Sequence, residues 1–434
     1  MLLLGSLIFV ASNGIRTLMV AVVVATFAFL FGKMLKPANK GFQRNTIFVI
    51  SLLAVTLPWL FIKLSAVNSN GNGAKTPLLI VGVSFYTLEM ISYLSDIFKE
   101  KLSPEKNYLS FMTYALYFPK FVQGPISRYE ELKAELFKEK RFDETEFTKG
   151  FVWVLFGFFL KLMIADKAAL LINPVFESPW AYQGIYCVLA AVLYSIELYA
   201  DFTGCVYICL GISRMFGVRL FVNFNRPYMA TSFKDFWKRW HISLSKWLSD
   251  YVYIPLGGSR HGSVRRVINL FITFLVSAFW HGLGVTFFIW GMLHALYRVC
   301  EDKFIKGTGK HPVISRLSVF FFATVGWVFF RADTLTDALS IFKFSVTGMN
   351  RSMFDANLIS NALGYKEAAL LALSIVFVLV KEIINERDKS IMSVFLKMPF
   401  IVRLALYCVA TVSIVVLGTY GFGFDASAFI YGGF

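Results

Sequence analysis

Residues 267–297 read VINLFITFLVSAFWHGLGVTFFIWGMLHALY, a long apolar run with basic residues at both ends. A membrane-spanning helix needs about 20 apolar residues, so this run is too long for one span and too short for two. Gly282 and Gly284 interrupt it directly after Trp280 and His281. We therefore predict a helical hairpin that enters and leaves the membrane on one side, with His281 near its deepest point.

The composition places the whole chain in a membrane. Of its 434 residues, 57% are hydrophobic and 16% are charged, whereas an average soluble domain has about 25% charged residues. This excludes a soluble enzyme. The 47 Phe residues exclude a disordered or nucleic-acid-binding chain as the explanation for the net charge of +16. The five cysteines lack the spacing of a disulfide framework or a metal site and are interpreted as small apolar residues.

Further segments are long and apolar enough to span a bilayer. They predict an all-α polytopic protein, a single integral-membrane domain over residues 1–434 with its core motifs within 77–331. No cleavable signal peptide is convincing, so we expect the first helix to stay. The predicted spans are 15–35, 46–64, 77–97, 150–172, 183–216, 312–330, 365–384 and 399–420.

The distribution of Lys and Arg predicts the orientation, because positive residues gather in cytoplasmic loops. The segments around Lys36, Arg239 and Lys303 are predicted to be cytoplasmic. The Asn/Gly-rich turn 68–73, the loop at Ala181 and the C-terminal residue Phe434 are predicted to lie outside. The stretch 108–126 lies between two basic segments and contains prolines, so we expect a re-entrant or interfacial segment whose broken backbone is shielded by protein or water.

His281 is the first candidate for chemistry. An ionisable residue deep in a bilayer is costly and therefore marks a functional site by default. A buried, neutral imidazole could accept a proton from a hydroxyl. The alternative is a histidine hydrogen-bonded between helices. For His294, in the second arm of the hairpin, packing is the favoured role, and solvent exposure accounts for His261 and His311.

The segment 232–251 has aromatic residues at i, i+3, i+4 and i+7 spacing. It predicts an amphipathic helix in the membrane interface, with its tryptophans at the headgroup level and Lys234, Lys238 and Arg239 facing water. His241 falls at the border of the aromatic face and is the second candidate. Its alternative is an interfacial histidine without a role.

Glu197 and Asp201 share one face of a predicted span and must look into the bundle or a cavity. They could contact a substrate. The alternative, at least as well supported, is a hydrogen bond or ion pair with a buried basic residue such as Lys161 or Arg214.

Several motifs occur together and in a characteristic order. The sequence resembles the membrane-bound O-acyltransferase family, in its bacterial alginate O-acetyltransferase-like branch. The motifs are VSFYT (83–87), FP (118–119), QGPI (123–126), FNRPY (224–228), FWKRWHISLS (236–245), YIPLGG (253–258), WHG (280–282), GWVFFRA (326–332) and FIY (429–431).

The resemblance implies a ring of transmembrane helices with re-entrant segments around a central funnel that meets at His281. It implies that His281 and His241 are catalytic, His281 as general base and His241 as a positioning or second acid/base group. It also implies a cytoplasmic thioester donor, with no permanently bound cofactor and no metal. The residues that we expect to contact substrates are Lys234, Lys238, Arg239, Trp240, Asn225, Arg226, Trp280 and Asp201.

Two features depart from the family pattern. Family members usually have a longer N-terminus with an extra helix, and this chain begins where their second helix would, so we expect the true start to lie upstream. Relatives commonly have an Asp near the position of Tyr207. The role of Asp201 in the local polar network is therefore open.

These patterns predict a multi-pass O-acyltransferase of the bacterial plasma membrane that moves acetyl from acetyl-CoA towards an exported cell-surface polysaccharide or an extracytoplasmic acyltransferase partner. Its other partner is the lipid bilayer, and nucleic acid is not expected. One alternative is transfer of D-alanine from a carrier protein to teichoic acid. The other is a transporter or channel that uses His281 as a proton or substrate site, although we see no inverted repeat.

Overall fold

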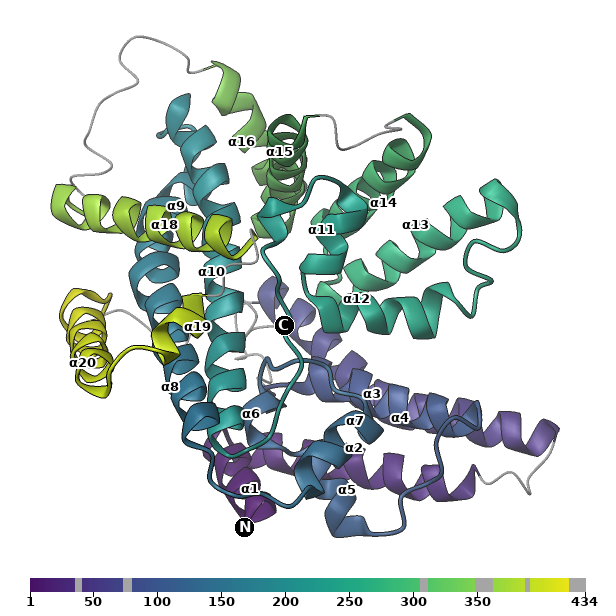
Figure 1. Ribbon diagram of the computed structural model, residues 1–434. Coiled ribbons are helices and arrows are strands. Elements are labelled where there is room, and N and C mark those ends of the chain that lie inside the picture. The colour runs from purple at the N-terminus through teal and green to yellow at the C-terminus, as the bar shows by residue number, and fades with distance from the viewer. Residues whose placement is uncertain (36–40, 73–79, 305–310, 348–361, 387–390, 421–434) are drawn as a thin grey trace.

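The computed structural model describes residues 1–35, 41–72, 80–304, 311–347, 362–386 and 391–420 (Figure 1). Regular structure in these ranges is helical, without strands. Six of the described helices are long and apolar enough to cross a membrane, so the predicted all-α polytopic fold is confirmed. These candidate spans are Ile15–Met34, Phe42–Ser65, Ile185–Met215, Gly262–His281, Pro312–Arg331 and Phe400–Leu417.

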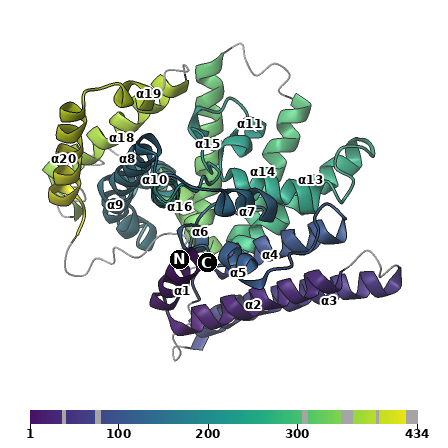
Figure 2. The same cartoon turned by 60° about the horizontal axis from the view of Figure 1, so that its bottom comes forward.

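The N-terminal helices form one layer. Figures 1 and 2 show α2 and α3 side by side, and both pack against α4. The helix α3 continues to Asn72, so the predicted turn is wrong for residues 68–72; residue 73 lies outside the described residues. Gly costs only about 1 kcal/mol in a helix, which is too little to end one by itself. The helices are α1 (Leu2–Ser12), α2 (Ile15–Met34), α3 (Phe42–Asn72) and α4 (Val83–Phe98).

The predicted span 77–97 is also corrected. The helix α4 has only 16 residues, fewer than the about 20 that a span needs, and nearly all of them are buried in protein. Its apolar residues therefore serve the protein interior, which a hydropathy pattern cannot distinguish from lipid.

The stretch 108–126 is broken, as predicted. It forms α5 (Tyr108–Ala115) and α6 (Phe118–Phe121), followed by irregular backbone before α7 (Tyr129–Phe137). Gln123 is fully buried. The N–H of Ile126 donates to Ser243 Oγ at 3.0 Å, and the N–H of Ser127 donates to Glu89 Oε1 at 3.0 Å. Protein side chains therefore shield the broken backbone.

Two long helices cross closely at the centre. The first is α8 (Glu144–Phe159), continued by a π-helical turn (Leu160–Ala165) and α9 (Asp166–Glu177), and the second is α10 (Ile185–Met215). A Cβ on Gly157 would lie 2.6 Å from Gly204 O, and one on Gly211 would lie 2.5 Å from Gly150 O. Glycines at two levels thus let the two backbones touch, as small residues do between membrane helices.

The two arms of the predicted hairpin are present as adjacent helices, and their entry into the membrane from one side stays a prediction. Figure 1 shows α13 (Gly262–His281) and α14 (Val285–Phe304) packed side by side. Shorter elements precede it: a 3-10 turn (Pro227–Met229), α11 (Phe233–Arg239), α12 (Ile242–Leu248) and a π-helical turn (Ser249–Tyr253). The described helices after the hairpin are α15 (Pro312–Arg331), α16 (Leu335–Thr347), α18 (Tyr365–Glu386), α19 (Ile391–Leu396) and α20 (Phe400–Leu417).

Candidate active site

His281 is the last residue of α13 and lies at the tip of the hairpin. Its side chain is buried, with the ring centroids of Trp280, Trp290 and Phe330 at 4.7, 5.2 and 5.1 Å. The chain turns directly after it at Gly282, where a Cβ would lie 2.3 Å from a neighbouring aromatic ring. A side chain at residue 282 would have to displace that ring. The helix ends at the histidine, and aromatic side chains enclose the imidazole.

His241 links α11 to α12 with a φ of +42°, a left-handed conformation that is uncommon for a residue with a side chain. Its ring is buried, 4.8 Å from the Phe202 ring, 6.3 Å from the Phe85 ring and 6.0 Å from the Trp280 ring. Among the described residues, neither ring nitrogen of His241 has a hydrogen-bond partner. Trp280 thus contacts both histidines and forms a shared wall between them.

The predicted single helix over 232–251 is wrong. The structure breaks it after Arg239, because Trp240 is extended and His241 is left-handed. The backbone of residues 223–225 pairs with this break: Ile242 N–H donates to Asn223 O at 2.9 Å. Trp240 and Trp247 are buried in protein, 2% and 6% exposed, and do not lie at a headgroup surface.

Asn223 was not among the residues predicted from the sequence. Its side chain is fully buried, and its Oδ1 accepts a hydrogen bond from Ser243 N–H at 2.9 Å. Together with its backbone carbonyl it holds the turn that carries His241. The only signal in the sequence is an isolated amide between Val222 and Phe224.

The tip of the hairpin is fastened to α3 and α4. Trp280 Nε1–H donates to Ser84 O at 3.1 Å, and Trp59 Nε1–H donates to Ser84 Oγ at 3.0 Å. The ammonium of Lys63, also on α3, donates to the carbonyl of Trp280. The sequence analysis also missed Trp59 and Lys63. Lys63 contacts residues more than 200 positions further along the chain, and Trp59 donates to a residue 25 positions away, so no local pattern reveals either contact.

The basic residues predicted to hold the donor do not stay together. Lys234 and Lys238 are exposed on α11. Arg239 instead forms a double hydrogen bond with Glu386, at 3.0 and 3.1 Å, and Arg226 Nε lies 3.2 Å from the same carboxylate. Only the two lysines are therefore presented to solvent, while the two arginines tie this region to α18.

Three further candidates from the sequence are Asp201, Glu197 and Asn225. Asp201 Oδ1 accepts a hydrogen bond from Lys161 at 2.7 Å, and Lys161 also pairs with Asp166 at 2.9 Å. The structure thus shows the ion-pair alternative for Asp201. Glu197, one turn away, is buried. Asn225 is exposed, and its Oδ1 accepts from Arg226 Nε at 3.0 Å.

The other histidines follow the predictions made for them. His294 is fully buried among aromatic rings, including those of Trp237 at 5.0 Å and Trp290 at 5.2 Å. His261 and His311 are exposed. Packing accounts for the first, and surface position for the other two.

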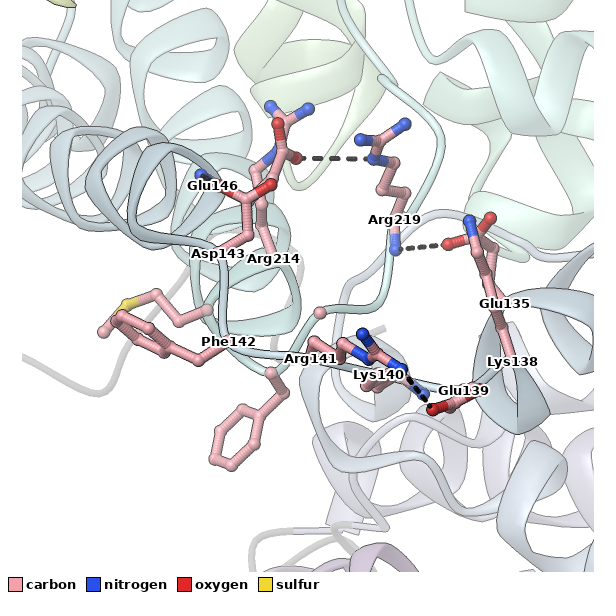
Figure 3. Close-up of a pocket in the computed structure, with 13 residues that line it drawn as sticks. Glu135, Lys138, Glu139, Lys140, Arg141, Phe142, Asp143, Glu146, Arg214 and Arg219 are labelled. Atoms are coloured by element: carbon pink, nitrogen blue, oxygen red, sulfur yellow. Dashed lines mark hydrogen bonds and ion pairs between the residues drawn. The ribbon is translucent and has the colours of Figure 1, made fainter.

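A separate polar pocket lies where α7, the start of α8 and the end of α10 meet (Figure 3). Glu146 accepts from Arg214 Nε at 2.7 Å and pairs with Arg219 Nε at 3.3 Å. Burial raises the pKa of Glu146, but hydrogen bonds from Lys149 and Arg214 outweigh it and set the pKa at about 2. Its arginines pair with carboxylates, and neither His241 nor His281 lines it, so we do not assign acyl transfer here.

The chain can be compared with known proteins. The model of the membrane-bound O-acyltransferase family matches residues 17–332, which include both histidines. The chain is 36% identical over 267 residues to a probable alginate O-acetylase AlgI of Pseudomonas syringae pv. tomato, which covers 59% of the chain and 50% of that relative. It is 34% identical over 305 residues to a peptidoglycan O-acetyltransferase of Helicobacter pylori, covering 63% and 58%.

The chain is also similar, at lower identity, to a protein named for transfer of a different acyl group. The chain is 24% identical over 277 residues to a teichoic acid D-alanyltransferase of Streptococcus thermophilus, covering 60% of the chain and 65% of that relative. The alignments to the more similar relatives span only about half of their length, 50% and 58%.

Proposed function

Because the chain belongs to the membrane-bound O-acyltransferase family, we propose that it transfers an acyl group from a cytoplasmic thioester to a hydroxyl beyond the membrane. The acyl group is acetyl and the donor is acetyl-CoA. The acceptor is an exported cell-surface polysaccharide or an extracytoplasmic partner that completes the transfer. Relatives named for O-acetylation of alginate and peptidoglycan support this choice.

The observation that carries the proposal is the meeting of two buried histidines at Trp280, whose ring lies 4.7 Å from the His281 ring and 6.0 Å from the His241 ring. The two histidines come from separate elements, the tip of the hairpin and the α11–α12 turn. Both imidazoles face one aromatic enclosure. Such an enclosure also keeps water away from a reactive thioester.

The chemistry follows from neutral imidazole. His281 accepts the proton of the acceptor hydroxyl while the hydroxyl oxygen attacks the thioester carbonyl. The tetrahedral intermediate then collapses and releases the thiolate, which takes the proton from the imidazolium and leaves as the thiol. His281 returns to its neutral form. His241 orients the hydroxyl or acts as a second acid/base group.

Transfer of D-alanine is a second candidate, because the chain is similar to teichoic acid D-alanyltransferases. That identity is 24%, against 36% for the alginate relative, so acetyl is favoured. Family membership speaks against the transporter alternative.

Mass spectrometry of cell-surface glycans, with and without the gene, tests the proposal. We expect loss of ester-linked acetyl groups and their return when the wild-type gene is restored. Loss of D-alanine with acetyl retained would support the second candidate. Unchanged glycans, combined with solute flux in proteoliposomes that lack acyl chemistry, would contradict both.

A further inference from the structure

The end of α13 poses a problem of backbone hydrogen bonding. A helix leaves its last carbonyls without partners inside the helix. Gly282 N–H pairs with Ala278 O at 2.9 Å, but the chain then turns away, and the carbonyls of Phe279 and Trp280 point beyond the helix. Since α13 is long and apolar enough to span a membrane, water is not a ready partner for these carbonyls.

Lys63 supplies the missing donor from another helix. Its ammonium donates to Trp280 O and lies 3.5 Å from Phe279 O. A positive charge at this position also opposes the negative end of the helix dipole. The ammonium is 5.2 Å from the centre of the Trp59 ring, one turn back on α3. Within the part of the chain that the structure describes, no carboxylate forms an ion pair with Lys63.

The contact belongs to a clamp of three helices. Trp59 from α3 and Trp280 from α13 donate to the hydroxyl and the carbonyl of Ser84, at the start of α4. The Lys63 contact adds the last turn of α13 to the same clamp. The next residue in the chain is His281, so the orientation of its imidazole depends on how this turn is held.

We propose that Lys63 is a positioning residue for His281: by binding the last carbonyls of α13 it holds the imidazole in the geometry that proton transfer requires. The inference deepens the proposed function and rests on it. Lys63 acts through the backbone and does not touch the substrates. A direct contact with the donor carbonyl is the competing role, and kinetics separates the two.

The variants at Lys63 are chosen by whether they can donate hydrogen bonds to the carbonyls of Phe279 and Trp280. Lys63→Met keeps an unbranched side chain, one heavy atom shorter than that of Lys, but removes every donor. Lys63→Arg restores a permanent charge and several N–H donors that can bind two carbonyls. Lys33→Met is the matched control, because Lys33 also lies in a candidate spanning helix with its ammonium over an aromatic ring, Phe29 at 4.2 Å.

The test uses the full chain, purified and reconstituted, with acetyl-CoA as donor. Lys63→Met should lower kcat about 10- to 100-fold, as a small misplacement of a reacting group does, with the KM for acetyl-CoA unchanged. Lys63→Arg should recover most of the rate, and Lys33→Met should behave as the wild type. A wild-type kcat in Lys63→Met, or a raised KM with kcat unchanged, would overturn the positioning role. So would a loss of rate that matches the loss of folded protein.

A second readout does not depend on activity. Diethyl pyrocarbonate modifies accessible imidazoles, and mass spectrometry reports the modification at each histidine. We expect faster modification of His281 in Lys63→Met than in the wild type or Lys33→Met, with His294 unchanged. Equal rates at His281 would contradict the inference. If the wild type transfers no acyl group while this change occurs, the proposed function fails, and only the structural part of the inference stands, that Lys63 holds the end of α13 and the imidazole of His281.

Discussion

At His241, the conformation of one residue decides where its side chain points. The φ of +42° turns the chain between α11 and α12 and directs the ring towards Trp280. Residues other than glycine adopt this left-handed conformation at a cost of roughly 1–2 kcal/mol. Backbone strain of this kind gathers at functional sites. The turn is held by Asn223, through its carbonyl and its side chain.

A pair of substitutions at this residue separates backbone strain from chemistry. Asn tolerates the left-handed conformation, whereas a β-branched residue does not. We expect His241→Asn to unfold at nearly the wild-type temperature and His241→Val at a lower one, while acyl transfer falls in both. Thermal unfolding in detergent measures the first quantity. Equal stability of the two variants would show that the left-handed turn imposes no constraint.

The sequence indicates some residues of the site and not others for a physical reason. His281 was predicted because a histidine, a glycine break and apolar flanks occur within a few positions. Lys63 and Asn223 act through partners on other elements, and no local pattern reveals such partners. Asp201 remained open between a substrate contact and an ion pair; the structure shows its ion pair with Lys161, and a substrate contact stays a prediction.

Where α8 packs against α10, the two backbones leave no room for a side chain. A methyl group on Gly157 would meet Gly204 O at 2.6 Å, which is closer than real Cβ contacts. The obstacle is backbone, which cannot rotate away. The two helices would have to separate, and the pairing of Lys161 with Asp201 joins the same helices nearby.

We therefore expect Gly157→Ala to destabilise the protein by about 1–3 kcal/mol, the usual cost of overpacking. Gly5→Ala is the control, since a Cβ on Gly5 has nothing within 4 Å. Thermal unfolding of both variants in detergent gives the comparison. If Gly157→Ala matched Gly5→Ala, the close approach of the two backbones would not be a determinant of stability.

The helix α11 presents Lys234 and Lys238 to solvent. Two free ammonium groups can attract the phosphates of a coenzyme A thioester as point charges. Replacing both lysines by Gln should raise the KM for acetyl-CoA and leave the protein level in the membrane normal. The same change at Lys138, another exposed lysine, should leave KM unaltered. A normal KM with reduced membrane insertion would indicate an anchoring role towards anionic lipid.

Comparison of predicted and observed helix bounds shows where the spacing of apolar residues predicts a helix correctly. The spans at 15–35 and 183–216 were predicted closely, because long apolar runs facing lipid or the bundle leave a strong signal. The segment 232–251 was predicted as one helix, because its aromatic spacing is helical on both sides of the break. The break at His241 depends on hydrogen bonds from residues 223–225, which lie outside the window.

Across the whole molecule, ion pairs join segments that lie far apart in the chain. Arg44 pairs with Glu100, Arg128 with Asp250 and Arg239 with Glu386. Each pair brings two segments together on one face of the protein. Which face is cytoplasmic stays a prediction, and Phe434 lies outside the described residues.

Labelling of single cysteines in a Cys-free background tests the orientation. Cysteines at positions 234 and 303 should react with an impermeant reagent only after the cells are opened. Cysteines at positions 181 and 434 should react in intact cells. Reaction of position 303 from outside would contradict the hairpin, since it would place the two flanks of α13 and α14 on opposite sides.

The central claim is that His281 takes the proton of the acceptor, and His281→Gln tests it most directly. The amide of Gln can form a hydrogen bond but cannot accept a proton, so packing is largely kept while the base is lost. A positioned base contributes about 10²- to 10⁴-fold in rate. The measurement is the rate of acyl transfer by the folded, purified variant. We predict a loss of at least about 100-fold, whereas a rate above about a tenth of the wild type would contradict the assignment.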